Sequence, residues 1–273
     1  MFLLKETALT YSPQMYWPIG KTVNFFCVSP NVRTTTLPDG ENDIPGFVNS
    51  NGQVDLLYAV NIGESESPVR INFRHALSKV QFQLRREVRS KSMLHVEVTD
   101  VDLLGTYSEG TFVYPRATTE ENNPTEASTG RWKDQTQILE AKIFQDTATV
   151  LTDEYKLFRS EKLQYTLSIP QPLVKSEESN GTYTGAYVRV LCSIYDQNTG
   201  LKLWPSATTP GYDKDSQNGY IYFPLNADGA KVTTWEPGKA YNYNLTIGVP
   251  KSGSTIDFDI TVDMYPEFVD SEI

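Results

Sequence analysis

The stretch Asp55 to Leu84, DLLYAVNIGESESPVRINFRHALSKVQFQL, decides how this chain folds. It begins with an apolar segment, passes through a polar and charged segment from Asn61 to Pro68, and ends in a new strand. In that strand Val80, Phe82 and Leu84 alternate with polar residues. A period of two is the mark of a strand with one buried and one wet face. The stretch therefore predicts a boundary between two β-domains near Asn61 to Pro68.

The same alternation recurs along the rest of the chain, with no sustained helical period. Strands that each have one wet face are typical of antiparallel sandwiches. We therefore predict an all-β protein whose C-terminal core buries Val80, Phe82, Leu84, Tyr243, Leu245, Phe258 and Ile260. The alternating sets are Leu163, Tyr165, Leu167 and Ile169; Val188, Val190, Cys192 and Ile194; Tyr241, Tyr243, Leu245 and Ile247; and Ile256, Phe258, Ile260 and Val262.

Two segments depart from this pattern. The apolar residues between Leu94 and Leu103 change phase midway, which predicts a β-bulge near Thr99-Asp100 because one extra residue shifts the alternation. Thr136 to Leu151 hints at a helix, although its β-branched residues weaken the hint. Polar segments rich in Gly, Pro, Asn and Asp predict long loops at Thr34 to Gly46, Pro115 to Gly130, Lys175 to Gly185 and Pro205 to Gly219.

Charge and cysteine content exclude several classes of protein. The 273 residues include 34 acidic and 24 basic side chains, so the net charge of -10 disfavours nucleic acid and anionic membranes as partners. The two cysteines, Cys27 and Cys192, lie on separate strand-like segments and predict free buried thiols. The segment Met1 to Lys5 is too short for a signal peptide, so we do not expect the chain as given to direct its own export.

No motif for nucleophilic, zinc or nucleotide chemistry occurs. His75 and His95 have no metal-binding neighbours, and His75 is better explained as a ring bonded to nearby backbone. Asp100 and Asp102 are interpreted, with Glu97, as solubilising charge. The Asp213 to Gly219 loop begins like a calcium loop but lacks its later ligands. We predict no catalytic residue, no bound metal and no cofactor.

The segment His75 to Val80, with Phe73 before it, resembles the domain junction of the fimbrillin-like (Mfa-like) proteins of the Bacteroidetes cell surface. In that family a DLLYA-type segment closes the N-terminal β-domain, and an F-x-H-A-L-S-K-V strand opens the C-terminal one. The resemblance covers about Met15 to Val262. Further similar segments are Met15 to Pro30, Gly105 to Phe112, Ile169 to Gln171 and Trp235 to Asn244.

The resemblance implies two tandem β-sandwich domains of transthyretin-like, Greek-key type: residues 1–66, incomplete, and residues 67–273. It implies a structural or adhesive pilin subunit of a cell-surface fimbrium, held to the outer membrane by a lipid anchor that is absent from this chain. Its partners would be other pilin subunits, joined by β-strand addition. The eleven residues from Asp263 to Ile273 favour a tip or accessory subunit that accepts a strand. The expected donor-strand groove is lined by Val23, Phe25, Cys27, Leu57 and Tyr58.

Two other functions stay open. The first is a carbohydrate-binding surface lipoprotein that never polymerises, because aromatic residues flank the long loops and rings suit sugars or proteins. Its partner would be a host or bacterial surface protein or a glycan. The second is a degraded hydrolase, which would need paired carboxylates across a cleft. The ligand-facing loop aromatics are Tyr183, Trp204, Tyr212 and Tyr220.

Overall fold

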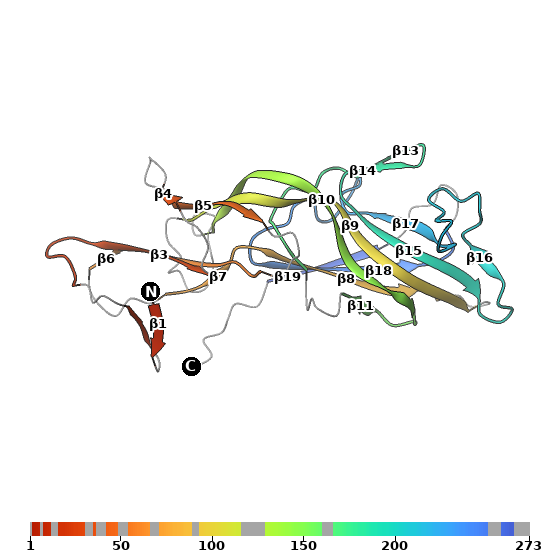
Figure 1. The fold of residues 1–273 in the computed structure, drawn as a ribbon, viewed down its shortest axis with the longest axis horizontal. Helices are drawn as coiled ribbons and strands as arrows, with labels where there is room; N and C mark the ends of the chain where they lie inside the picture. Colours follow the sequence, from red (N-terminus) through yellow and green to blue (C-terminus); the bar gives the residue numbers. More distant parts are fainter. Residues whose placement is uncertain are drawn as a thin grey trace.

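The computed structural model describes residues 2–5, 8–11, 16–30, 35–36, 42–48, 54–65, 71–88, 93–115, 129–159, 166–250 and 258–264 (Figure 1). These residues form nineteen strands and no helix, which confirms the predicted all-β class. None of them therefore belongs to a helix that could cross a membrane. The strands are β1 (Phe2–Lys5), β2 (Ala8–Tyr11), β3 (Val23–Ser29), β4 (Thr35–Thr36), β5 (Asn42–Val48), β6 (Leu57–Glu64), β7 (Arg74–His75), β8 (Ser78–Arg86), β9 (Leu94–Val113), β10 (Arg131–Val150), β11 (Lys156–Phe158), β12 (Thr166–Ser168), β13 (Glu177–Ser179), β14 (Thr182–Thr184), β15 (Tyr187–Asp196), β16 (Lys202–Trp204), β17 (Gly219–Pro224), β18 (Lys239–Ile247) and β19 (Phe258–Met264).

The larger sheet of seven strands is built on the long antiparallel pair β9–β10. Each of these strands has 20 residues, and they pair along almost their whole length. On the other edge of β9, residues 94–104 pair with β15 and residues 109–113 pair with β5. The β9–β10 ribbon therefore joins the N-terminal strands to the rest of the protein (Figure 1).

The second sheet of five strands contains one parallel pair. β8 and β18 run parallel, from Lys79 beside Ala240 to Arg86 beside Ile247. β8 also pairs with β11 and β12, and β18 pairs with β19. Parallel neighbours need a long crossover, and here the crossover contains most of the larger sheet.

The main hydrophobic core lies between these two sheets and combines residues of β8, β9, β15, β17 and β18. Five residues predicted to be buried are confirmed as fully buried members of it. Cys192 also lies there, while Cys27 is half-buried. The predicted burial of Phe258 and Ile260 lies outside the side chains that the structure describes. The confirmed residues are Val80, Phe82, Leu84, Tyr243 and Leu245.

The hint of a helix over Thr136 to Leu151 is wrong, because Arg131 to Val150 is the strand β10. Its backbone pairs with β9 instead of with itself. Four register shifts interrupt that pairing, for example between Gln145 and Thr149. Each shift disturbs the period of two, so the strand is hard to see in the sequence.

The β-bulge predicted near Thr99-Asp100 is confirmed. Leu191 pairs with Asp100 and Cys192 pairs with Val98, which leaves Thr99 as the extra residue of β9. Its hydroxyl donates a hydrogen bond of 3.3 Å to the carbonyl of Leu191. The bulge restores inward-facing positions for the apolar residues on both of its sides.

Gly105 lies where β9 exchanges β15 for β5 as its neighbour. Its φ of 70° lies in the left-handed region, which costs a residue with a side chain about 1–2 kcal/mol. A Cβ atom at this position would lie 1.9 Å from the carbonyl oxygen of Gly185. Glycine is therefore required here by conformation and by space.

The three-stranded sheet β3–β6–β7 covers a second core. This core contains Tyr58 and Ile44 from the N-terminal strands, and Ala76, Phe112 and Leu167 from the rest of the chain. Residues 61–64 of the expected hinge continue strand β6. The division into residues 1–66 and 67–273 stays a prediction, and β5 crosses it by pairing with β9.

Replacing Leu84 with alanine should lower the free energy of unfolding by about 2–5 kcal/mol, because it removes a fully buried side chain and leaves a cavity. Leu201→Ala is the control, since that side chain is 65% exposed. Urea unfolding measures both. Equal losses in the two variants would contradict the assignment of the core.

Gly105→Ala should destabilise the protein by more than about 2 kcal/mol, because the left-handed conformation and the clash with Gly185 both oppose it. Gly229→Ala is the matched control: its φ is 82°, but no atom lies within 4 Å of the added methyl group. That control should cost about 1–2 kcal/mol. A loss no larger than that of the control would show that the close approach is absent.

Candidate functional site

The two halves of the Asp55 to Leu84 stretch bind each other. β6 and β7 are antiparallel neighbours, and the Ala76 amide donates a hydrogen bond of 2.8 Å to the Leu56 carbonyl. The ring nitrogen Nδ1 of His75 lies 2.9 Å from Oδ2 of Asp55. His75 therefore has a structural partner in the Asp55 carboxylate.

β6 is the middle strand of its sheet, with β3 on one edge and β7 on the other. Among the described strands, none pairs with the second edge of β3. Such an edge carries a row of backbone donors and acceptors that can bind a further strand. The candidate site begins with this free edge of β3.

The five residues predicted to line the groove do not share one face. Directly paired residues lie on the same face of a sheet, so Tyr58, opposite Val28, faces the second core. Cys27 pairs with Ala59, and Phe25 pairs with Asn61, on the opposite face. Leu57 shares that opposite face, and Val23 pairs with Glu64 beyond a bulge.

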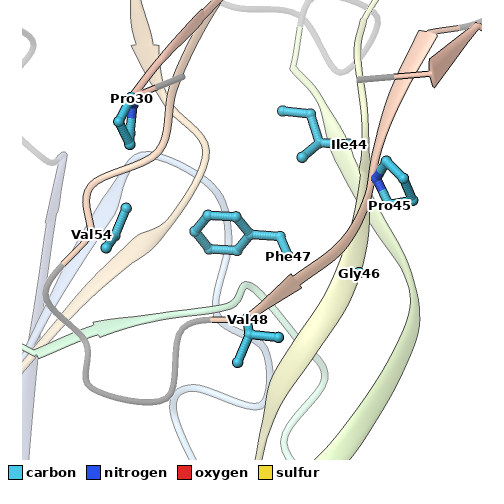
Figure 2. A pocket seen from close by; sticks show the side chains of 7 residues that line it. All are labelled: Pro30, Ile44, Pro45, Gly46, Phe47, Val48 and Val54. Atoms are coloured by element: carbon cyan, nitrogen blue, oxygen red, sulfur yellow. The ribbon is translucent and has the colours of Figure 1, made fainter. Parts of the chain in front are cut away.

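An apolar pocket lies beside the end of β3. It has a volume of about 440 Å³ and separates Pro30 and Val54 from strand β5. Figure 2 shows the Phe47 ring pointing from β5 toward Val54. The sequence predicts a loop from Thr34 to Gly46, but part of that segment belongs to strand β5. Pro45 and Gly46 interrupt the alternation that would have revealed the strand. The lining residues are Pro30, Ile44, Pro45, Gly46, Phe47, Val48 and Val54.

Four tyrosines gather on the outer face of the larger sheet, and we call them the outer tyrosine cluster: Tyr183, Tyr187, Tyr220 and Tyr222. The rings of Tyr183 and Tyr222 stack at 3.7 Å, only 7° from parallel. Tyr187 meets both rings edge-on, and Tyr220 lies 6.3 Å from Tyr222. Two of these residues, Tyr183 and Tyr220, were predicted as ligand-facing aromatics.

The structure does not bring the other two predicted aromatics into the cluster. Trp204 is buried in the main core, where its ring fills the space next to Gly219. Tyr212 is half-buried in the following loop and bridges to Gly219 through the backbone. Tyr187 and Tyr222 also flank the long loops in the sequence, and the pairing of β15 with β17 brings them into the cluster.

A network of ion pairs adjoins the cluster. The Asp102 carboxylate is fully buried, and Arg189 donates to its Oδ2 from Nη2 at 2.8 Å and from Nε at 3.1 Å. Lys142 Nζ lies 3.0 Å from Asp102 Oδ1 and 3.2 Å from Asp100 Oδ1. Burial lowers the pKa of Lys142, but these two carboxylates outweigh burial and raise it. Arg189 also binds Glu140.

The interpretation of Asp100 and Asp102 as solubilising charge is therefore wrong. Neighbouring side chains cover both carboxylates, and each is matched with a cation. Glu97 lies 2.9 Å from Nε2 of His95. Hydrolysis by a carboxylate pair needs a cleft between the two groups, whereas these carboxylates are held in ion pairs.

Hydrogen bonds within the Asp213 loop also satisfy the carboxylate of Asp213. The amide of Ser216 donates to it at 3.1 Å, and the hydroxyl of Ser216 donates as well. These hydrogen bonds lower the pKa of Asp213. Within the described ranges, no group of three or more histidine, cysteine, aspartate or glutamate side chains is placed to hold a metal ion.

Alkaline pH should destabilise the protein. Burial raises the pKa of Tyr58 and Tyr114, and it raises that of Tyr241 to about 12. Tyrosines in the unfolded chain ionise near pH ~10, so the stabilisation that these groups give is complete below that pH and is lost as the pH rises toward the folded pKa. We expect the free energy of unfolding to fall between pH ~10 and pH ~12.

Tyr114→Phe is the variant that isolates this effect, because the Tyr114 hydroxyl has no hydrogen-bond partner among the described residues. It should leave stability at neutral pH nearly unchanged and flatten the alkaline loss. Urea unfolding across the pH range measures both quantities. An equally steep loss in the variant would contradict the raised pKa of Tyr114.

The sequence matches the fimbrillin-like family over residues 2–263, which confirms the resemblance carried by the His75 segment. None of the curated proteins matches it significantly. Among solved structures, a fimbrial protein from Bacteroides vulgatus ATCC 8482 is similar, with a TM-score of 0.59 and 15% sequence identity over 97% of this chain and 84% of that chain.

A second structure, described as a "putative cell adhesion protein" from Bacteroides uniformis ATCC 8492, gives a TM-score of 0.46 and 12% identity over 94% of this chain and 79% of that chain. Identities this low show only that the fold is shared. The similarity in fold is inferred from the Bacteroides vulgatus structure. The family match spans nearly the whole sequence, and the chain therefore belongs to the fimbrillin-like family.

Proposed function

We propose that this chain is a cell-surface fimbrial subunit that accepts a β-strand from a neighbouring subunit along the free edge of β3. Membership of the fimbrillin-like family supports a structural and adhesive role without catalysis. The observation that carries the acceptor role is the free edge of β3 beside an apolar pocket. Residues 1–66 would then form the accepting unit, and residues 67–273 would form the larger sandwich.

An added strand gains main-chain hydrogen bonds along β3, while its alternate side chains enter pockets that fix its register. The pocket between Val54 and β5 is lined by apolar side chains and lies next to Pro30, which follows β3. It suits one or more apolar side chains of the incoming strand. The pocket therefore supplies register, and the edge supplies affinity.

Exposed apolar side chains support the same location. Six of the twelve large ones in the described residues lie between residues 16 and 62. Exposed apolar surface that gathers in one region marks an interaction site, whereas scattered single residues do not. Half of the exposed large apolar side chains thus belong to residues 1–66, the proposed accepting unit. The six are Tyr16, Ile19, Phe26, Val48, Val54 and Ile62.

A carbohydrate-binding surface protein is less well supported, because Trp204 lies in the core and does not join the outer tyrosine cluster. The tip or accessory position, the outer-membrane lipid anchor and the identity of the donor subunit stay predictions from the sequence.

The proposal predicts that a matching strand peptide stabilises the isolated chain. Peptides from the C-termini of neighbouring fimbrial subunits should raise the melting midpoint by about 5–10 °C at about 100 times the dissociation constant. Val48→Asp, which places a charge in the pocket, should abolish the rise. Val150→Asp is the matched control, since Val48 is 48% exposed and Val150 is 47% exposed.

If the peptide still raises the melting midpoint of Val48→Asp, the pocket takes no part in strand binding. If no peptide changes the midpoint of the unmodified chain, the acceptor role is wrong.

A further inference from the structure

Strand acceptance makes no use of the outer tyrosine cluster, whose residues come from β15 and β17 of the larger sheet and from β14 of the hairpin β13–β14. Figure 1 shows these strands. We infer that this cluster is a docking site for a protein segment that presents lysine or arginine side chains. The inference does not depend on the free edge of β3.

The hydroxyl groups of the cluster differ from those of two core tyrosines, Tyr58 and Tyr243. In the core, the Tyr58 hydroxyl accepts a hydrogen bond of 3.0 Å from the Gly130 amide, and the Tyr243 hydroxyl accepts one of 2.8 Å from the Trp235 ring. In the cluster, no hydroxyl is hydrogen-bonded to a described residue. Tyr183, Tyr220 and Tyr222 are half-buried, whereas Tyr187 is buried beneath them. Tyrosines with an apolar ring and an unbonded hydroxyl are typical of interfaces.

Carboxylates surround the cluster. Burial is the main reason why the pKa values of Tyr183 and Tyr187 are raised, and the charge of Glu178 raises both further. Glu177 and Glu178 lie exposed on β13, which pairs with β14 beside Tyr183. At Tyr220, burial is the main reason why the pKa is raised; the charge of Arg189 lowers it, while Asp102, Asp100 and Asp213 raise it. A negative field of this kind attracts cations and repels phosphate, sulfate and other anions.

Three cations near this face are already held in ion pairs. Arg189 and Lys142 are bound to Asp102, with Glu140 and Asp100 as their further partners. Lys175 is held 2.9 Å from Asp228. Glu177 and Glu178 add two exposed carboxylates to this face, and the whole chain carries a net charge of -10. Charge complementarity favours a basic partner over a neutral or acidic one.

The cluster already binds one cation through a ring. The guanidinium carbon of Arg189 lies 4.5 Å from the centre of the Tyr220 ring, which is a cation–π contact. An incoming lysine or arginine would meet the same combination at Tyr183 and Tyr222: aromatic faces together with the Glu177 and Glu178 carboxylates. Such a contact binds more strongly as the partner excludes water.

The test uses the full chain and a labelled peptide of alternating arginine and glycine, with fluorescence anisotropy as the readout at about 0.15 M salt, where diffuse attraction is screened. The double variant Tyr183→Ala/Tyr222→Ala should weaken binding about tenfold. Glu177→Gln/Glu178→Gln should also weaken it, by about fivefold. Circular dichroism checks that each variant is folded.

Three controls separate the cluster from the net charge. Tyr155→Ala removes a half-buried tyrosine that lies under another guanidinium, that of Arg85 at 4.3 Å. Asp153→Asn/Glu154→Gln removes two negative charges elsewhere on the surface, one of them the carboxylate that pairs with Arg86. Val48→Asp alters the strand-accepting pocket. The first two should leave binding within about twofold, and the third should not reduce it.

Loss of binding in the cluster variants alone supports the docking site. Equal weakening by the cluster and control variants would overturn it, because the attraction would then be diffuse. So would the absence of any binding to the arginine peptide. Binding of neutral oligosaccharides that Tyr183→Ala abolishes, with no binding of the peptide, would replace the basic segment by a glycan.

Discussion

The antiparallel pair β9–β10 is the constraint on which the rest of the structure depends. Its two 20-residue strands give backbone hydrogen bonds to the main sandwich at one end and to β5 at the other. Val96 and Val98 lie in the main core, and Phe112 lies in the second core. The same ribbon therefore packs against both cores. Gly105 permits this, because it lets β9 change neighbours where other residues would clash.

The candidate acceptor edge follows from this arrangement. The ribbon holds β5 through its pairing with β9, and the Asp55 to Leu84 stretch holds β6 against β7. β3 is then attached through β6 alone among the described strands, and an apolar pocket opens between its end and β5. A sheet that ends in such an edge is stabilised by an added strand. The proposed acceptor function thus depends on an edge of β3 that no described strand covers.

Much of the larger sandwich could be predicted from the sequence. The period of two identified Val80 and Leu245 as core residues, and its change of phase located the bulge at Thr99. Strand pairing could not be predicted, because the partners lie far apart in the sequence. The parallel pair β8–β18 and the burial of Asp102 are examples. Asp102 is covered only because Arg189 and Lys142 arrive from two neighbouring strands.

Only part of the candidate site could be predicted, because the site also depends on strand pairing between distant segments. The DLLYA and His75 segments identify the junction from the sequence. The pocket also needs Phe47, and its strand could not be recognised because Pro45 and Gly46 interrupt the alternation. Trp204 reads as a loop aromatic, but a hairpin turns it into the core. Local pattern identifies strands, whereas tertiary packing decides which side chains stay accessible.

Hydrogen–deuterium exchange of the β3 amides tests the central claim most directly. In the isolated chain, the amides of Val23 to Ser29 that point away from β6 should exchange much faster than those of Leu57 to Glu64, because they lack partners. A matching strand peptide should slow them to the rate of β6. If the β3 amides of the isolated chain are already as protected as those of β6, the edge is covered and the account is contradicted.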